Sequence, residues 1–279
     1  MYRPCIEIDP EIEDWCYPPS MEALDFVSEG SHLYGVIYIA QGIPPHPTIL
    51  LLHGFPGTEK NLDLAQVLRR AGFNTVVFSY RGCWGSQGFY SFSHVISDSI
   101  NAVRYLQSDF AQKNYGVDPE RILVFGHSMG GFAMAKVADA MLGIRDFCFI
   151  SGWNLGFDGK NGLNDSESQK KLDLLLKLGA PPLHGTNKEA LLEEIRCHLH
   201  DWDIVNSASS FINRNILILG AKNDNITPLR TNHAPFVEAL RKYNNEGTKE
   251  IIMNTDHSYS DCRVALAGHI LDWLESLGY

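Results

Sequence analysis

The sequence predicts an α/β protein with a mostly parallel sheet and helices on both of its faces. Short apolar runs typical of strands buried on both faces alternate with stretches of helical period along much of the chain. This alternation indicates βαβ units, whose crossover helices cover a parallel sheet. The 279 residues, 44% of them hydrophobic, suffice for a single large core, or for one domain with an insertion.

The expected elements follow in chain order. Two strand signals, at 23–28 and 33–40, flank a turn at 29–31. The alternating part then predicts strand 48–53, helix 62–71, strand 74–79, helix 95–106, strand 121–125, helix 130–142 and strand 147–150. After a break, the pattern resumes with strand 215–219, helix 236–243, strand 249–253 and helix 263–277.

The break at 152–212 contains no convincing strand. It is far longer than the roughly 2–6 residues of an ordinary connection in such sheets, so it is interpreted as an insertion. Two capping boxes predict helices within it. They are Ser166 with Gln169, before helix 170–177, and Thr186 with Glu189, before helix 190–199, with Gly179-Ala-Pro-Pro182 between the two helices. The expected parts are an acidic segment at 1–22, a core at 23–151 and 213–279, and a helical lid at 152–212.

The net charge of −10 is concentrated at the N-terminus, where residues 1–29 hold eight carboxylates against the single Arg3. We interpret this stretch as a solvated, mobile segment, with a docking tail for a basic partner as the alternative. The acidity of the chain disfavours binding to nucleic acid.

Neither a membrane span nor a secretory leader is predicted. The longest apolar runs fall far short of the ~18 residues that a spanning helix needs, and the N-terminus lacks a basic region followed by an apolar stretch. The six cysteines show no zinc-ligand spacing, which favours free thiols. The expected location is therefore cytoplasmic.

The strongest chemical signal is Gly126-His-Ser128-Met-Gly130-Gly131, between an expected strand and an expected helix. A serine on such a sharp turn projects its hydroxyl above the sheet edge, and the turn is crowded enough to require small residues at 126 and 130. The helix that begins here adds unpaired N–H groups and a positive dipole end. We therefore predict that Ser128 is a nucleophile.

A serine nucleophile needs a base, and the base needs an acid that orients it. His257 directly follows the last expected strand, so it should lie at the same sheet edge as Ser128. Asp224 follows strand 215–219 and is the predicted acid. The neighbouring Asp256 should point away from the imidazole, and Asp201 and Asp203 remain weaker alternatives.

The segment His53-Gly54-Phe55-Pro56-Gly57 follows the first buried strand. We predict that the N–H groups of Phe55 and Met129 stabilise an oxyanion, and that His53 anchors this loop by a hydrogen bond. An ordinary Gly/Pro turn is the alternative. Trp84, in a glycine-rich loop at 79–88, is a candidate for a substrate pocket, with core packing as the alternative, and Trp153 is a second candidate.

Together these residues resemble the α/β-hydrolase family over residues 30–279. The motifs are His53-Gly54-x-x-Gly57, Tyr80-Arg81-Gly82 with Gly85 and Gly88, Gly126-x-Ser128-x-Gly130, Asp224 and His257. The sequence looks most like cinnamoyl and feruloyl esterases, lysophospholipase-like hydrolases and the catalytic domains of prolyl-oligopeptidase-type peptidases. The resemblance implies a catalytic triad, an oxyanion loop and a lid of variable sequence.

The expected activity is hydrolysis of a small or medium acyl or aryl ester through an acyl-enzyme on Ser128, without metal or organic cofactor. The alternatives are an aminopeptidase or oligopeptidase, and a non-catalytic protein on the same scaffold. A peptidase would need a lid carboxylate to hold the substrate ammonium, and Glu193, Glu194, Asp201 and Asp203 are the candidates. The expected partner is thus a small ester or a short peptide. A homo-oligomer is compatible with the sequence, which does not specify the oligomeric state.

Overall fold

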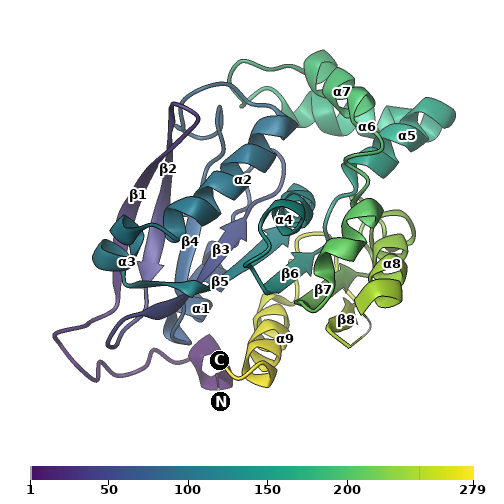
Figure 1. The fold of residues 1–279 in the computed structure, drawn as a ribbon. Helices are drawn as coiled ribbons and strands as arrows, with labels where there is room; N and C mark the ends of the chain where they lie inside the picture. Colours follow the sequence, from purple (N-terminus) through teal and green to yellow (C-terminus); the bar gives the residue numbers. More distant parts are fainter. Residues whose placement is uncertain (1, 245) are drawn as a thin grey trace.

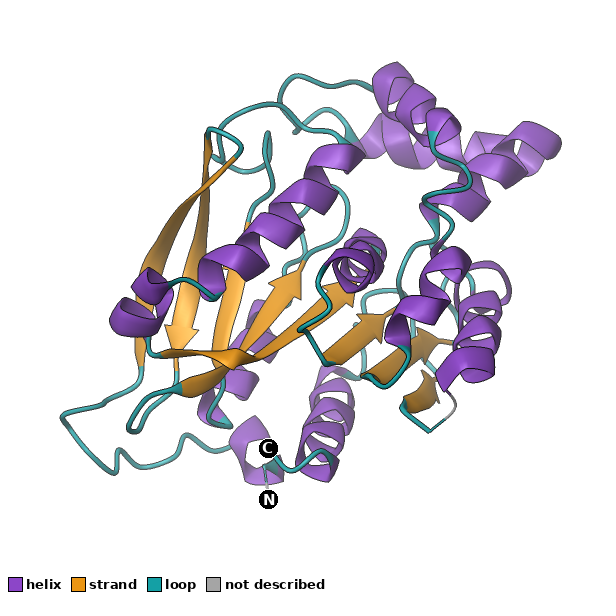
Figure 2. Cartoon of the chain, viewed as in Figure 1, coloured by secondary structure: helices purple, strands orange, loops and turns teal. Residues whose placement is uncertain are grey.

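The computed structural model describes residues 2–244 and 246–279, and within them forms a single sheet of eight strands in the order β1-β2-β4-β3-β5-β6-β7-β8 (Figures 1 and 2). The strands are β1 (Ser20–Ser28), β2 (Ser31–Ile39), β3 (His46–Leu52), β4 (Asn74–Phe78), β5 (Val117–His127), β6 (Asp146–Ile150), β7 (Asn215–Ala221) and β8 (Thr248–Met253). The pairs β1–β2 and β2–β4 are antiparallel, and all five other pairs are parallel. The predicted mostly parallel sheet is confirmed.

Helices cover both faces of the sheet. They are α1 (Leu62–Arg70), α2 (Phe92–Leu106), α3 (Asp109–Tyr115), α4 (Met129–Ala140), α5 (Leu155–Asn164), α6 (Ser166–Gly179), α7 (Lys188–Cys197), α8 (Ala234–Asn244) and α9 (Arg263–Ser276), with 3-10 helices η1 (Arg3–Ile6) and η2 (Ile204–Phe211) and a π-helical turn η3 (Leu229–His233). One core lies under α2, α4 and α8, and a second lies under α1 and α9 (Figure 1).

The strands show two burial patterns, of which the sequence predicts the first. Every residue of β4 and β6 is buried, as a strand covered on both faces requires. The outer strand β1 alternates instead, with Leu24 and Phe26 buried and Met21 and Val27 exposed. The parallel strands end at one common edge, and the candidate site is built there.

A helical insertion, which we define as residues 155–211, lies between β6 and β7 at one end of the molecule (Figure 1). Both predicted helix caps are off by one residue. Asp165, not Ser166, accepts a hydrogen bond from Ser168 N and begins α6, and Asn187, not Thr186, accepts one from Ala190 N and begins α7.

Helix α5 was not predicted, because its three glycines disfavour a helix. Packing explains two of them. A Cβ at Gly156 would lie 2.3 Å from the main-chain N of Asp203, and one at Gly159 would lie 2.4 Å from the side chain of Ile195. Tertiary contacts therefore decide the conformation of this segment.

The acidic N-terminal segment is partly docked rather than wholly solvated. Arg3 Nε donates to Asp272 of α9 (2.8 Å), and Arg70 of α1 donates to the Cys5 carbonyl (2.6 Å). The first strand begins at Ser20, three residues before the expected start. All six cysteines are free. Within the described ranges, no helix has the length and apolar character needed to cross a bilayer.

Candidate active site

Ser128 occupies a sharp turn between β5 and α4, with φ 57° and ψ −123°. The turn is tightly packed against main chain. A Cβ at Gly126 would lie 2.1 Å from the Gly130 carbonyl oxygen, and one at Gly130 would lie 2.0 Å from the Leu52 carbonyl oxygen. Real Cβ atoms do not approach that closely, which confirms that these two positions require glycine. Ser128 is thereby held in a backbone conformation that non-glycine residues rarely adopt.

The hydroxyl of Ser128 has no hydrogen-bond partner among the described residues and is not sealed off from solvent. Gly54, from the loop after β3, lies directly against it. A Cβ at Gly54 would lie 2.8 Å from Ser128 Cβ and 3.2 Å from its Oγ. The loop expected to carry oxyanion donors therefore contacts the predicted nucleophile.

His257 and Asp224 come together from the loops after β8 and β7. His257 Nδ1 lies 2.7 Å from Asp224 Oδ2, and the side chain of Asp224 is fully buried. Thr227 completes the arrangement, because its Oγ1 donates to Asp224 Oδ2 (2.9 Å) and lies 3.2 Å from His257 Nδ1. The neutral imidazole thus carries its proton on Nδ1 and leaves Nε2 free to accept one.

The carboxylate of Asp224 is stabilised as an anion. Its Oδ1 accepts hydrogen bonds from the main-chain N–H groups of Ile226 and Thr227, both at 2.8 Å. Burial acts to raise the pKa of Asp224, but the hydrogen bonds and charge of His257 and the bonds from Thr227 outweigh it, so the pKa lies below its usual value. Thr227 escaped the sequence analysis, although its place three residues after Asp224 is typical of a local cap for a carboxylate.

The alternative acids lie elsewhere. Asp256 is exposed and accepts from the N–H groups of Ser258 and Ser260, so it does not contact the imidazole of His257. Asp203 accepts from Asn154 Nδ2 and caps η2, and Asp201 lies beside His200 on the surface.

His53 holds the loop that contacts Ser128. Its Nδ1–H donates to the Gly54 carbonyl oxygen at 2.8 Å, which confirms the predicted anchoring hydrogen bond. Because the C=O and N–H of a trans peptide point in opposite directions, this bond turns the Phe55 N–H away from His53. In the described residues neither the Phe55 N–H nor the Met129 N–H has a hydrogen-bond acceptor. Burial lowers the pKa of His53 to about 3, so the ring is a neutral donor.

The two tryptophans hydrogen-bond groups next to the site residues. Trp84 is 45% exposed, and its Nε1 donates to the Pro56 carbonyl (2.9 Å), next to Phe55. Trp153 is buried; its main-chain N donates to the Ser128 carbonyl (2.8 Å) and its Nε1 donates to Asp158 (2.8 Å). Neither is among the residues around the cavity described below.

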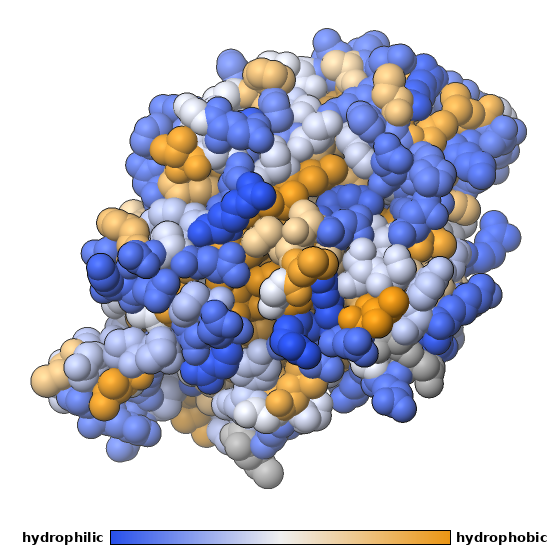
Figure 3. Space-filling view, viewed as in Figure 1, coloured by the Kyte–Doolittle hydropathy of each residue, from blue (hydrophilic) through white to orange (hydrophobic). Residues whose placement is uncertain are grey.

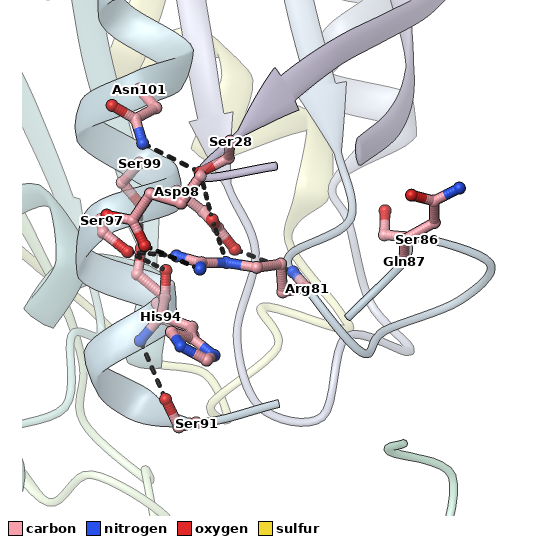
Figure 4. Close-up of polar contacts among 12 residues, drawn as sticks. Ser28, Arg81, Ser86, Gln87, Ser91, His94, Ser97, Asp98, Ser99 and Asn101 are labelled. Atoms are coloured by element: carbon pink, nitrogen blue, oxygen red, sulfur yellow. Dashed lines mark hydrogen bonds and ion pairs between the residues drawn. The ribbon is translucent and has the colours of Figure 1, made fainter. Parts of the chain in front are cut away.

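The loop that carries Trp84 is tied to helix α2 by the buried ion pair of Arg81 and Asp98 (Figure 4). Arg81 donates to Asp98 through its main-chain N (2.8 Å) and its Nε (2.7 Å), and Ser28 Oγ donates to the same carboxylate (2.6 Å). Burial raises the pKa of Asp98 despite these bonds, so both partners depend on the pairing. This fixes the end of the loop that begins at β4.

A largely apolar cavity of about 370 Å³ lies between the insertion and the core. Its walls come from α5, α6 and the segment that follows Asp224. The lining residues are Asp158, Asn161, Ser168, Lys171, Leu172, Leu174, Leu175, Leu178, Asn225, Ile226, Pro228 and Thr231. Figure 3 shows apolar side chains at the surface over α5 and α6, where Leu174 and Leu178 are 56% and 70% exposed. The cavity can accept an apolar group next to the segment that follows Asp224.

The fold, with a serine on its glycine-bound turn and a paired histidine and aspartate at the same sheet edge, defines a hydrolase of the α/β class. A model of the alpha/beta hydrolase family matches residues 49–267, and the chain belongs to this family.

Sequence relatives match only parts of the chain. The chain is 30% identical to the uncharacterized protein YfhR of Salmonella typhi over 119 residues. This match covers 41% of this chain and 39% of that protein. The chain is 32% identical to lysophosphatidylserine lipase ABHD12 of Danio rerio over 88 residues. This match covers 30% of this chain and 21% of that protein. The matches thus span well under half the length of these relatives.

Solved structures show the same fold at low sequence identity. The esterase Pf2001 of Pyrococcus furiosus has a TM-score of 0.66 at 16% identity, covering 94% of this chain and 92% of its own. Est1E of Butyrivibrio proteoclasticus, solved with ferulic acid bound, has a TM-score of 0.67 at 17% identity, covering 92% and 100%. The acylaminoacyl peptidase of Pyrococcus horikoshii has a TM-score of 0.69 at 16% identity, covering 92% and 41%. These structures, at 16–17% identity, show that the chain shares their fold.

Proposed function

We propose that the protein is a serine hydrolase that cleaves carboxylic esters of small or medium acyl or aryl groups through an acyl-enzyme on Ser128. The observation that carries the proposal is the hydrogen-bonded pair of Asp224 and His257 at the sheet edge where the glycine-bound turn presents an unpartnered Ser128 hydroxyl. A nucleophile, a base and an acid in these positions match the requirements of acyl transfer.

In the proposed mechanism, His257 Nε2 takes the proton of Ser128 Oγ as the oxygen attacks the ester carbonyl. The N–H groups of Phe55 and Met129 stabilise the negative oxygen of the tetrahedral intermediate. The intermediate collapses, the carbon–oxygen bond to the leaving group breaks, and His257 returns the proton to that alcohol. Water then attacks the acyl-enzyme by the same route, which releases the acid and restores Ser128.

Asp224 keeps the proton of the resting imidazole on Nδ1 and stabilises the imidazolium that forms during each step. Thr227 holds the carboxylate in place, and the two main-chain N–H groups on Asp224 Oδ1 keep it ionised. No step of this mechanism needs a metal or an organic cofactor.

An ester is favoured over an aminoacyl substrate by the positions of the insertion's carboxylates. A peptidase of that kind needs an available carboxylate for the substrate ammonium. Glu194 is occupied by the N–H groups of Phe92 and Ser93 at the start of α2, and Asp203 by Asn154. None of the four candidate acids from the insertion lines the cavity.

The carboxylate that does line the cavity, Asp158, already accepts a hydrogen bond from Trp153. Burial raises the pKa of Asp158, so the anion that a substrate ammonium would need is costlier there than at an exposed carboxylate. The leucines of α6 and the segment at 225–228 instead suit an apolar acyl or aryl group.

The test is a panel of p-nitrophenyl esters of rising acyl length beside aminoacyl p-nitroanilides, with Ser128→Ala as control. We expect hydrolysis of the esters with an optimum at one chain length, weak or no turnover of the anilides, and loss of activity in Ser128→Ala. Faster turnover of the anilides would replace the ester proposal with a peptidase. Activity that survives in Ser128→Ala would exclude Ser128 as the nucleophile.

A further inference from the structure

The loop that carries His257 is held by its main chain as well as by its side chain. His127, the residue before Ser128, points its Nε2 at the His257 carbonyl oxygen (3.0 Å), and the two imidazole rings lie 5.1 Å apart. One hydrogen bond therefore joins the neighbour of the predicted nucleophile to the predicted base. While this hydrogen bond is intact, it limits the distance between Ser128 and the loop that carries His257.

The other side of the His127 ring is also occupied. Asn61, the buried residue before α1, places its Nδ2 3.5 Å from His127 Nδ1. Arg263 Nη2 donates to Asn61 Oδ1 (2.9 Å), so the amide of Asn61 must present its NH₂ group, and not its oxygen, to His127. An acceptor at Nδ1 leaves the ring proton on Nε2, where it is donated to His257.

Arg263 is itself fixed, because Nε and Nη2 donate to the two carboxylate oxygens of Asp63 (2.8 and 2.7 Å). Its Nη1 donates to the Ser258 carbonyl oxygen (3.1 Å). The consecutive carbonyls of His257 and Ser258 are thus both held by one network whose other members lie on the α1 side of the site.

We propose that His127 is a positioning residue that sets the place of His257 relative to Ser128, and that Asn61 and Arg263 fix the tautomer in which it does so. The proposal rests on the assignment of His257 as the base in the proposed function. The direction of the two hydrogen bonds explains why the residue is a histidine. A neutral imidazole can accept a hydrogen bond at Nδ1 and donate one from Nε2 on the opposite side of the ring.

The electrostatic surroundings of His127 favour the same neutral ring that donates from Nε2. The charged and titratable groups that face His127 are His257, Arg263 and Asp224. Burial, followed by repulsion from His257, lowers the pKa of His127 to about 3, with a smaller contribution from Arg263. The ring therefore stays neutral beside the imidazolium that His257 becomes during the reaction.

The test uses substitutions that separate the donor from the shape of the ring. His127→Phe keeps a planar ring without a donor, and His127→Gln keeps an N–H that can reach the His257 carbonyl. Asn61→Asp removes the donor to His127 Nδ1 at unchanged size. The matched control is His46→Phe, because His46 is a buried histidine that also bonds a main-chain carbonyl through Nε2 (Gly42, 3.1 Å), but at the opposite end of β3.

We expect kcat for the best p-nitrophenyl ester to fall about 10- to 100-fold in His127→Phe and about tenfold in Asn61→Asp, with KM within twofold, because small displacements of a catalytic group have effects of this size. His127→Gln should stay within about threefold of the parent, and His46→Phe within twofold. A kcat within twofold of the parent in His127→Phe would overturn the proposal, as would equal losses in the Phe and Gln variants.

Nuclear magnetic resonance tests the hydrogen bond without relying on activity. In the parent protein, ¹⁵N shifts should show His127 neutral with its proton on Nε2 near pH 7. The ¹³C carbonyl resonance of His257 should move upfield in His127→Phe and stay in place in His127→Gln. If these signals appear while no ester is hydrolysed, the proposed function fails and the hydrogen-bond assignment stands. A proton on Nδ1, or an unmoved carbonyl resonance, would disprove the assignment whatever the activity.

Discussion

The turn at Ser128 and the helix pair α5–α6 meet different packing demands, although both border the candidate site. At the turn, glycines 126 and 130 contact main chain so closely that no Cβ could be added. In the helix pair, Gly156 and Gly159 also leave no room for a Cβ, but a Cβ at Gly162 would lie 3.6 Å from its nearest neighbour, and Leu174 and Leu178 are more than half exposed. The difference indicates that the core fixes the geometry of the chemistry, while the part of the insertion around Gly162 and the exposed leucines of α6 shapes the apolar cavity with more tolerance.

The largest effect should come from the hydrogen-bonded pair in the core. Asp224→Asn removes the charge that stabilises the imidazolium and the acceptor that fixes its tautomer, so we expect kcat for an ester to fall about 10³- to 10⁴-fold. The matched control is Asp256→Asn, one residue before His257, which should stay within about twofold because Asp256 bonds only the N–H groups of its own turn. Similar losses in both variants would show that Asp224 has no special role. Steady-state kinetics on the same ester measure both.

The next effect tests the packing of the turn itself. Gly130→Ala places a methyl group about where the Leu52 carbonyl oxygen lies, at 2.0 Å, so main chain must shift. We expect a loss of about 3 kcal/mol or more in the free energy of unfolding, comparable with severe overpacking or strain. Urea denaturation followed by circular dichroism measures it. A loss below about 1 kcal/mol would mean that the turn relaxes easily and that the contrast with the insertion is wrong.

Features that depend on neighbouring residues can be predicted from the sequence, whereas features that depend on contacts between distant residues cannot. The buried strands and the Gly-x-Ser-x-Gly turn obey local rules, since strand period and the need for small residues are written in neighbouring positions. Asp224 and His257 could be paired because parallel strands end at one edge. By contrast, α5 depends on contacts of Gly156 and Gly159 with residues some 40 positions away, which no local pattern reveals.

The network behind His257 shows the same limit. Asn61 and Arg263 are 202 positions apart, and neither belongs to a recognisable motif. Polar residues at a helix start and after a loop are common, so only their placement around His127 distinguishes them. For Trp84 and Trp153, the residue type alone suggested a pocket and gave no sign of their hydrogen bonds. The indole N–H of Trp84 donates to the Pro56 carbonyl, and that of Trp153 donates to Asp158.

Acid should destabilise the core through two of its buried histidines, His53 and His127. Burial lowers the pKa of His53 and of His127 to about 3, whereas a histidine in the unfolded chain has a pKa near 6.5. Between these values the unfolded chain binds protons that the folded chain does not. The stabilisation is therefore complete above about pH 6.5 and is lost as the pH falls toward 3, by up to about 1.4 kcal/mol per pH unit for each histidine.

Urea denaturation at pH 7, 6 and 5 measures this slope. His127→Gln should flatten it by up to one histidine's share, and His200→Gln, at an exposed position of the insertion, should leave it unchanged. A slope that is the same in the parent and in His127→Gln would contradict the assignment of His127 as a buried neutral ring.

A smaller effect should follow from changing the cavity wall. Leu178→Glu places a charge in the apolar lining, so we expect KM for the preferred p-nitrophenyl ester to rise about tenfold while kcat changes less than threefold. Leu142→Glu is the matched control, because Leu142 is 83% exposed after α4 and does not line the cavity. An unchanged KM in Leu178→Glu would remove this cavity from the substrate site.

The smallest effect completes the comparison and has the opposite sign from Gly130→Ala. At Gly162 an added methyl group meets only ordinary contacts, with Leu172 Cδ2 at 3.7 Å and the main chain of Gln169 at 3.6 Å. Alanine in a helix interior is favoured over glycine by about 0.5–1 kcal/mol, since it loses less backbone freedom on folding. Gly162→Ala should therefore raise the free energy of unfolding by up to about 1 kcal/mol and leave ester hydrolysis unchanged. If it destabilised the protein as Gly130→Ala is expected to, the part of the insertion around Gly162 would be packed as tightly as the nucleophile turn, and its separate role in shaping the cavity would have to be abandoned.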